Sequence, residues 1–214
     1  MTTKQNLLTF WQSKNIPEKI LDAFVDIPRE LFVLPEYQHQ AYADKPLPTL
    51  RDQSISQPTT VMMMLQALDP QEGENILEVG AGVGYQATLL SKIVGIKGKI
   101  TSLEVIPELV TTAKQNINLL NRDNIIVLEA DGSAGFPDHA PYDKIIITAA
   151  CPSIPPPIIE QLKDNGTIIA PIGDLKSQML VKGTKVNGKM ELEFLGSFLF
   201  VPLKGKYGFK EELL

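Results

Sequence analysis

Three glycines at alternate positions directly follow the apolar residues 75–79; they are Gly80, Gly82 and Gly84. An apolar strand that passes through such a turn into a helix forms a nucleotide cradle. The turn lets a ligand approach the backbone, and the helix N-terminus offers unpaired N–H groups. Glu104 stands twenty residues after Gly84, where an acidic side chain can accept hydrogen bonds from two ribose hydroxyls. The pattern predicts a nucleoside site, although a plain tight turn and a solvated strand end would also produce it.

The spacing of these glycines, G-x-G-x-G, differs from the G-x-G-x-x-G of dinucleotide-binding folds. It points away from NAD and towards S-adenosylmethionine. Asp131-Gly132 follows a later predicted strand, at the sheet edge where ligands of open α/β sheets bind. Asp131 would bond an adenine amino group there, with Gly132 leaving room for the ring. Taken alone, the same dipeptide is also a common turn.

Ser54 and Ser56 alternate just before a predicted helix. Serine is a favoured N-cap residue, so helix capping is one interpretation of this pair. A serine nucleophile is not indicated, because neither histidine, His39 or His139, lies in a hydrolase motif such as G-x-S-x-G. The histidines also make no metal-ligand pattern with Cys151, so we expect no metal site and interpret Cys151 as a small, partly buried residue.

The hydrophobic pattern predicts helices and strands in alternation, which is typical of a parallel sheet covered on both faces. We expect helices near residues 7–11, 17–25, 58–68, 85–94, 107–120 and 155–162. We expect strands at 75–79, 100–105, 125–128, 142–148, 166–172, 179–186 and 192–201, the last two joined by a hairpin turn at Asn187-Gly188. Residues 27–32 read as a break with a short helical turn, residues 35–58 as irregular, and residues 205–214 as loose.

The composition is that of a soluble globular protein, with 214 residues, 43% hydrophobic and 21% charged. The formal net charge of -5 argues against a large nucleic-acid-binding face. A single cysteine permits no internal disulfide, and no apolar run approaches the roughly 20 residues that span a bilayer. We expect a cytoplasmic monomer with no nucleic-acid or membrane partner. It would be one domain over residues 1–214, with an N-terminal helical and substrate-loop region (1–70), a cofactor-binding core (71–175) and C-terminal strands (176–214).

Over nearly its whole length the sequence resembles the protein-L-isoaspartate O-methyltransferase family. The glycine motif is shared by many methyltransferases, whereas Gln-Ser-Ile-Ser-Gln-Pro and the late Val-Pro-Leu are far more specific to this family. The matching segments are residues 41–48, 53–58, 77–86, 131–132, 140–143, 148–150, 154–155, 171–173 and 201–203. The chain departs from the pattern at Ser54, where the family usually has Thr, and at Asp52, where Gly is common.

The resemblance implies a Rossmann-like class I methyltransferase that uses S-adenosylmethionine: a mostly parallel, doubly wound sheet with a C-terminal antiparallel hairpin and an N-terminal helical extension. Members methylate the free α-carboxylate of L-isoaspartyl residues in damaged proteins. The ester then collapses to a succinimide, whose hydrolysis returns some normal aspartate.

The resemblance also implies roles for individual residues. The active-site serine is Ser56. The substrate-binding residues are Ser54 and, through backbone pairing with an extended peptide, Val201, Pro202 and Leu203. The cofactor-binding residues are Gln53, Glu78, Gly80, Gly82, Gly84, Glu104, Asp131 and Gly132.

Two alternatives stay open on the sequence alone. One is a methyltransferase of the same fold that acts on nucleic acid or a small molecule. Amino-directed nucleic-acid enzymes usually carry Asn/Asp-Pro-Pro-aromatic after the fourth strand, whereas residues 148–152 read Thr-Ala-Ala-Cys-Pro. The other is a catalytically weak binding protein that has kept the fold, which only the departures at Asp52 and Ser54 favour.

Overall fold

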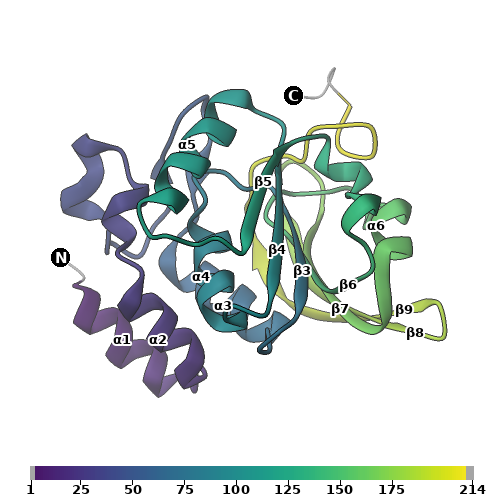
Figure 1. The fold of residues 1–214 in the computed structure, drawn as a ribbon, viewed down its shortest axis with the longest axis horizontal. Coiled ribbons are helices and arrows are strands. Elements are labelled where there is room, and N and C mark those ends of the chain that lie inside the picture. Colours follow the sequence, from purple (N-terminus) through teal and green to yellow (C-terminus); the bar gives the residue numbers. More distant parts are fainter. Residues whose placement is uncertain (1–2, 211–214) are drawn as a thin grey trace.

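The structure is a computed structural model and describes residues 3–210 of the chain. Its main sheet has seven strands in the order β5-β4-β3-β6-β7-β8-β9 (Figure 1). Their bounds are β3 Asn75–Val79, β4 Lys99–Glu104, β5 Ile125–Glu129, β6 Tyr142–Ile147, β7 Leu162–Gly173, β8 Gln178–Val186 and β9 Lys189–Phe198. The first five strands in spatial order are parallel, and β8 and β9 are antiparallel additions at one edge. The predicted doubly wound sheet with a C-terminal hairpin is therefore confirmed.

Helices cover both faces of this sheet, with α3, α4 and α5 on one side and α6 on the other (Figure 1). The α-helices are α1 Lys4–Ser13, α2 Glu18–Asp26, α3 Pro58–Leu68, α4 Tyr85–Val94, α5 Pro107–Asn118 and α6 Pro156–Gln161. Short 3₁₀ turns are η1 Arg29–Phe32, η2 Pro35–Gln40, η3 Gly132–Ala134 and η4 Pro137–His139. Three of the α-helices begin with proline. Proline is well tolerated there because the first backbone N–H of a helix has no partner within the helix.

The central strands are apolar on both faces because both faces are covered. In β3, Ile76 and Leu77 are fully buried although they point in opposite directions, Ile76 towards the core that includes α3 and α4 and Leu77 towards the core that includes α6. The N-terminal helices extend the first of these cores. Trp11 packs edge-on against Phe24, with ring centroids 4.6 Å apart, and its indole N–H donates to Thr59 at 2.9 Å.

Two segments predicted to be irregular or loose are ordered in the structure. Within residues 35–58, the strands β1 Leu47–Pro48 and β2 Ser54–Ile55 form a small antiparallel pair. The prediction for the C-terminal tail is wrong for residues 205–210. The Lys206 N–H donates to the Asp131 carboxylate at 2.8 Å, and Phe209 is buried at 9% exposure. Residues 211–214 lie outside the described part of the chain.

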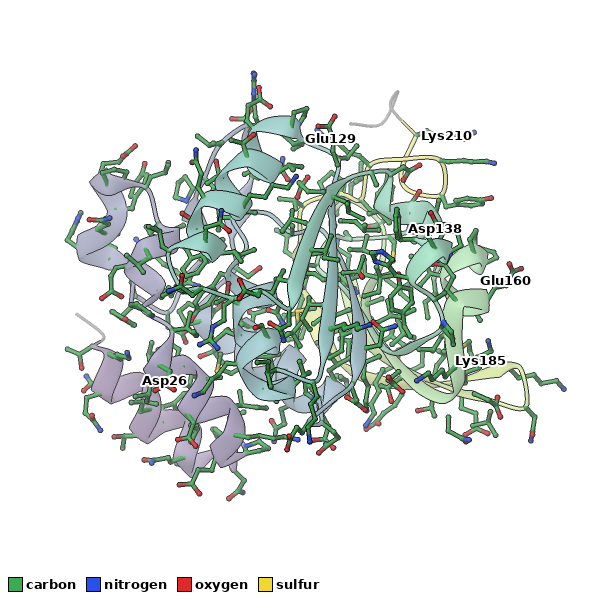
Figure 2. All side chains as sticks on the ribbon, viewed as in Figure 1. Asp26, Glu129, Asp138, Glu160, Lys185 and Lys210 are labelled. Carbon is green, nitrogen blue, oxygen red and sulfur yellow. The ribbon has the colours of Figure 1, made fainter. Side chains whose placement is uncertain are left out.

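Element boundaries shift most at the C-terminal strands. β7 begins at Leu162 rather than at 166, and β9 spans Lys189–Phe198 rather than 192–201. The hairpin turn is confirmed, since Asn187 and Gly188 have φ of 50° and 75°, the left-handed pair that a tight hairpin needs. Charged side chains such as Asp26, Glu129 and Glu160 point outward (Figure 2). Among residues 3–210, none of the helices combines the length and apolarity needed to cross a bilayer.

Candidate active site

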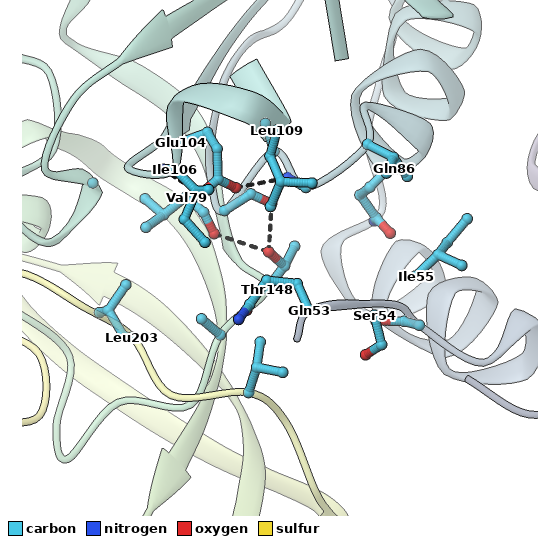
Figure 3. A pocket seen from close by; sticks show the side chains of 18 of the residues that line it. Gln53, Ser54, Ile55, Val79, Gln86, Glu104, Ile106, Leu109, Thr148 and Leu203 are labelled. Carbon is cyan, nitrogen blue, oxygen red and sulfur yellow. Dashed lines mark hydrogen bonds between the residues drawn. The ribbon is translucent and has the colours of Figure 1, made fainter. Parts of the chain in front are cut away.

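A cavity opens at the carboxyl ends of β3, β4 and β6, where ligands of open α/β sheets bind (Figure 3). It is closed on the opposite side by β2 and the start of α3. Ten of the thirteen predicted site residues line it: Gln53, Ser54, Ser56, Gly80, Gly82, Glu104, Gly132, Val201, Pro202 and Leu203. The chain thus brings its N-terminal serines, its glycine turn and its late Val-Pro-Leu segment to one place. Glu78, Gly84 and Asp131 do not line the cavity.

The three glycines serve three different purposes. Only at Gly82 does the space for a side chain stand open, with nothing within 4 Å of an added Cβ. A Cβ on Gly80 would collide with the Thr148 hydroxyl, which donates to the Gly80 carbonyl at 2.6 Å. A Cβ on Gly84 would press against Ala113 of α5 at 3.3 Å. A side chain at Gly80 or Gly84 would therefore meet other parts of the protein, and only at Gly82 would it enter open space.

Glu104 lies at the end of β4 and faces the glycine turn. One of its carboxylate oxygens accepts the Gly82 N–H at 2.9 Å, and the other accepts the N–H groups of Val105 and Ile106 at 2.9 and 3.0 Å (Figure 3). The side chain is only 7% exposed, so these donors fix its direction. It lines the cavity beside Gly82. Glu104 is thus placed as an acceptor for paired hydroxyl groups, as its position in the sequence predicts.

Glu78 belongs to β3, next to Ser102 of β4, and does not line the cavity. It is fully buried, accepts a hydrogen bond from the Ser102 hydroxyl and has one oxygen, Oε1, without a partner among the described residues. Burial raises the pKa of this carboxyl to about 8. Glu78 is therefore mostly uncharged at neutral pH, and its predicted contact with a cofactor is not supported by its position.

Asp131 faces its own loop and the C-terminal tail. Its carboxylate accepts the Ser133 N–H and hydroxyl at 2.9 and 2.6 Å and the Lys206 N–H at 2.8 Å. Only the neighbouring Gly132 lines the cavity. These contacts secure the chain that follows Leu203. A carboxylate can accept about four hydrogen bonds, so the predicted bond from Asp131 to an adenine amino group stays a prediction.

Arg29, which the sequence patterns did not indicate as a site residue, holds the segment that contains Ser54 and Ser56. Arg29 is fully buried, and its guanidinium donates to the carbonyl oxygens of Ser56 at 2.7 Å and Ala41 at 2.9 Å. The helix-capping interpretation of the serines is wrong. The N-cap of α3 is Gln57, and the backbone N–H of Thr59 is satisfied by Asp44 at 2.9 Å. Neither serine hydroxyl therefore caps α3.

The tip of the β1–β2 hairpin reaches across the cavity to α5. Arg51 forms an exposed ion pair with Glu108, its Nε 2.9 Å from the carboxylate. Arg51 and Asp52 both have φ of 56°, a left-handed conformation that glycine adopts without strain. This geometry gives a physical reason for the glycine that is common at position 52 in the family. Asp52 is exposed and does not line the cavity.

The Val-Pro-Leu segment runs alongside the end of β6. Ala150 donates to the Val201 carbonyl at 2.8 Å, and its own carbonyl accepts the Leu203 N–H at 2.7 Å. The Leu203 carbonyl accepts the Phe209 N–H at 2.9 Å. Because alternate residues of an extended chain face opposite edges, Val201 and Leu203 point their backbone groups inward. The carbonyl of Pro202 and the backbone groups of Lys204 face the other edge, and the predicted substrate-binding role of Val201, Pro202 and Leu203 stays a prediction.

Cys151 follows Ala150 and is completely buried. Burial raises the pKa of its thiol to about 12, so it is inert at neutral pH. His139 is paired with the Thr101 hydroxyl at 2.9 Å, away from the cavity lining.

The sequence was compared with protein-family models and with known proteins. The family model described as protein-L-isoaspartate(D-aspartate) O-methyltransferase matches residues 2–208. The chain belongs to the protein-L-isoaspartate O-methyltransferase family. Protein-L-isoaspartate O-methyltransferase 2 of Archaeoglobus fulgidus is 44% identical over 199 residues, covering 93% of this chain and 91% of that protein. The enzyme of Methanococcoides burtonii is 42% identical, covering 90% of this chain and 95% of its own length.

Solved structures agree with the fold of this methyltransferase. A protein-L-isoaspartate O-methyltransferase superimposes with a TM-score of 0.89 at 28% identity, covering 96% of this chain and 67% of that one. A Plasmodium falciparum protein crystallised with S-adenosyl-L-homocysteine superimposes with a TM-score of 0.82 at 22% identity, covering 95% of this chain and 99% of its own, a likeness of fold alone. The chain is thus a class I methyltransferase fold with the family's own sequence segments around one cavity.

Proposed function

We propose that this protein transfers the methyl group of S-adenosylmethionine to the free α-carboxylate of L-isoaspartyl residues in damaged proteins, as the names of its relatives indicate for them. One observation carries the proposal. The nucleoside half of the cavity, with Gly82 and Glu104, and the serine half, with Ser54 and Ser56, open into the same space. A methyl donor and a carboxylate acceptor can therefore meet there.

The residues on the first side fit S-adenosylmethionine. The open space over Gly82 admits a thioether chain close to the backbone, and the fixed carboxylate of Glu104 suits two ribose hydroxyls. Apolar side chains of Ile106 and Leu109, with Gly132 opposite, provide a slot for a flat base. Gln53 lines the same space and extends the polar contacts of this side.

The chemistry needs little catalytic apparatus. S-adenosylmethionine supplies a methyl group that is already electrophilic. A carboxylate has an unperturbed pKa near about 4, so it is ionised at neutral pH and requires no general base. The protein must hold the carboxylate oxygen in line with the methyl carbon and keep water out. We assign this positioning to the Ser56 hydroxyl, which would donate one hydrogen bond to the carboxylate, with Ser54 as a second contact.

Recognition of many different damaged sequences would come from the peptide backbone. The outward-facing carbonyl of Pro202 and the backbone groups of Lys204 would pair with an extended substrate chain. Such main-chain hydrogen bonding does not depend on the identity of the substrate side chains. After transfer, a backbone amide nitrogen of the substrate would attack the methyl ester and expel methanol, which gives a succinimide whose hydrolysis returns part of the damage to normal aspartate.

We assign the substrate loop, the cofactor site and the acceptor side to successive parts of the chain. In our proposal, residues 1–70 carry the helical extension and the substrate loop, residues 71–175 hold the cofactor, and residues 176–214 complete the acceptor side. We further propose that the protein acts as a monomer in the cytoplasm, where the lone cysteine stays reduced. A net charge of -5 disfavours a nucleic-acid substrate.

The test uses S-adenosylmethionine with a labelled methyl group and two peptides of one sequence, which differ only in isoaspartate or aspartate at a single position. The proposal predicts base-labile label on the isoaspartyl peptide alone. Equal labelling of both peptides would point to another methyltransferase specificity. Cofactor binding without transfer to either peptide would indicate a binding protein that has lost catalysis.

A further inference from the structure

Three buried polar atoms beside the segment with Ser54 and Ser56 make no hydrogen bond of ordinary geometry among the residues that the structure describes, although the Arg29 guanidinium and the Tyr85 hydroxyl lie close enough to interact with each other. They are the side-chain Nε2 of Gln86, the hydroxyl of Tyr85 and the Nη1 of Arg29. Their side chains are 8%, 2% and 0% exposed, respectively. A buried donor without an acceptor is destabilising, so buried polar atoms in folded proteins are usually paired with the protein, with water or with a ligand.

These atoms gather at one wall of the cavity. Tyr85 and Gln86 are the first residues of α4 and both line the cavity together with Ser54 and Ser56. The Gln86 side chain points from α4 towards the segment that carries Ser54 and Ile55 (Figure 3). Arg29 lies behind this wall, its guanidinium carbon 5.0 Å from the centre of the Tyr85 ring and its Nη2 bonded to the Ser56 carbonyl.

The start of α4 adds to the same polarity. This helix has ten residues, and its N-cap Gly84 provides no side-chain acceptor for the first N–H groups. The N-terminal end of a helix carries a partial positive charge. An amide, a phenol, a buried cation and a helix N-terminus together form a wall whose unpaired groups are mainly hydrogen-bond donors. A carboxylate is the complementary ligand, because it is negatively charged and only accepts.

We propose that Gln86 binds a ligand carboxylate in this cavity, with Tyr85 as a second donor and Arg29 as the buried positive charge behind them. The inference rests on the proposed function, which brings two carboxylates here: that of the methionine part of the cofactor and the α-carboxylate of the isoaspartyl acceptor. Both are recognised by the same chemistry, and binding measurements separate them.

The variant Gln86→Leu removes the amide at nearly constant volume. The probes are S-adenosylhomocysteine and 5′-methylthioadenosine, which share the nucleoside and the thioether, although only the first has a carboxylate. If Gln86 binds the cofactor carboxylate, calorimetry shows about tenfold weaker binding of S-adenosylhomocysteine with methylthioadenosine unchanged. If it binds the acceptor, both affinities stay unchanged and the KM for the isoaspartyl peptide rises about tenfold at similar kcat.

Controls keep the result interpretable. Gln12→Leu makes the same change on the exposed face of α1 and should alter neither ligand affinity nor KM. Should Gln86→Leu fold poorly, Tyr85→Phe removes one hydroxyl and predicts a smaller change of about threefold in the same selective sense. Equal weakening of both nucleosides, or no change in any of the three measurements, would overturn the proposal. A wild type that binds S-adenosylhomocysteine without methylating any peptide would contradict the proposed function alone, and the calorimetric comparison would still decide the role of Gln86.

Discussion

The carboxylate of Glu104 and the backbone N–H of Gly82 are hydrogen-bonded at 2.9 Å, which ties the end of β4 to the turn after β3. Gly82 is the glycine of the motif where the space for a side chain is open, and both residues line the cavity. The proposed ribose acceptor, Glu104, therefore lies next to the open space at Gly82 proposed for the thioether, and a hydrogen bond joins the two residues. A nucleoside bound here would contact both at once.

Glu104→Ala should weaken S-adenosylhomocysteine binding by about 10- to 100-fold, because hydrogen bonds to a charged acceptor contribute about 1.5–3 kcal/mol. Calorimetry measures the effect directly. Glu129→Ala is the matched control, since Glu129 is the register neighbour of Glu104 on β5, is exposed and does not line the cavity. Equal affinity in the wild type and Glu104→Ala would remove Glu104 from the ribose site.

Ser56→Ala should lower kcat/KM for an isoaspartyl peptide by about 10- to 100-fold, because the carboxylate loses one hydrogen bond that positions it. Cofactor affinity should stay within about twofold, since the predicted contact is with the acceptor. Steady-state kinetics and calorimetry together test this split. Ser197→Ala, on the exposed part of β9, controls for the substitution itself. A collapse of cofactor affinity in Ser56→Ala would contradict the assignment of Ser56 to the substrate.

The glycines of the motif should respond differently to alanine. Gly82→Ala should cost about 1–2 kcal/mol of folding free energy, for its left-handed backbone, and should weaken S-adenosylhomocysteine binding at least about tenfold. In Gly84→Ala the backbone is also left-handed, and the new Cβ would in addition crowd Ala113. This variant should therefore lose about 2–4 kcal/mol of folding free energy, with a smaller change in S-adenosylhomocysteine binding. Urea unfolding and calorimetry measure both quantities. The interpretation of the turn fails if Gly84→Ala is the variant that mainly loses affinity.

Glu78 should make stability depend on pH. Its pKa is raised from 4.5 to about 8 in the folded chain, so between these values the folded chain keeps a proton that the unfolded chain has lost. The contribution of this group to the free energy of unfolding therefore falls as pH rises through this interval and levels off above it. Glu78→Gln cannot titrate and should lose less stability than the wild type between about pH 5 and about pH 8. Parallel stability curves for the two proteins would show that Glu78 is ionised when buried.

The sequence predicted the fold well because its local patterns and its tertiary packing agree. The glycine turn, the apolar strands and the proline-started helices are all local signals, and α4 and β3 have the predicted bounds. The contacts that the sequence did not predict join residues far apart in the chain. Gly84 makes room for Ala113, and Asp131 is engaged by Lys206. No spacing rule links such pairs.

The same reason explains the residues that sequence reasoning missed. Arg29 holds the Ser56 carbonyl from 27 positions away, and Thr148 occupies the space beside Gly80 from the end of β6. Arginine on a short turn normally points to solvent, so nothing in its neighbourhood signals complete burial. Gln86 stands two residues after Gly84 and could have been found, since an amide in the first turn of a helix at a ligand site is a candidate donor.

We propose that this cavity methylates isoaspartyl carboxylates as the first step of repair. The decisive measurement is repeated incubation of an isoaspartyl peptide with the protein and S-adenosylmethionine, followed by chromatography against isoaspartyl and aspartyl standards. We expect a methyl ester, then a succinimide, then growing amounts of the normal aspartyl peptide, all formed far more slowly when the cofactor is left out. An isoaspartyl peptide that remains unmodified in the presence of a cofactor that the protein demonstrably binds would contradict it.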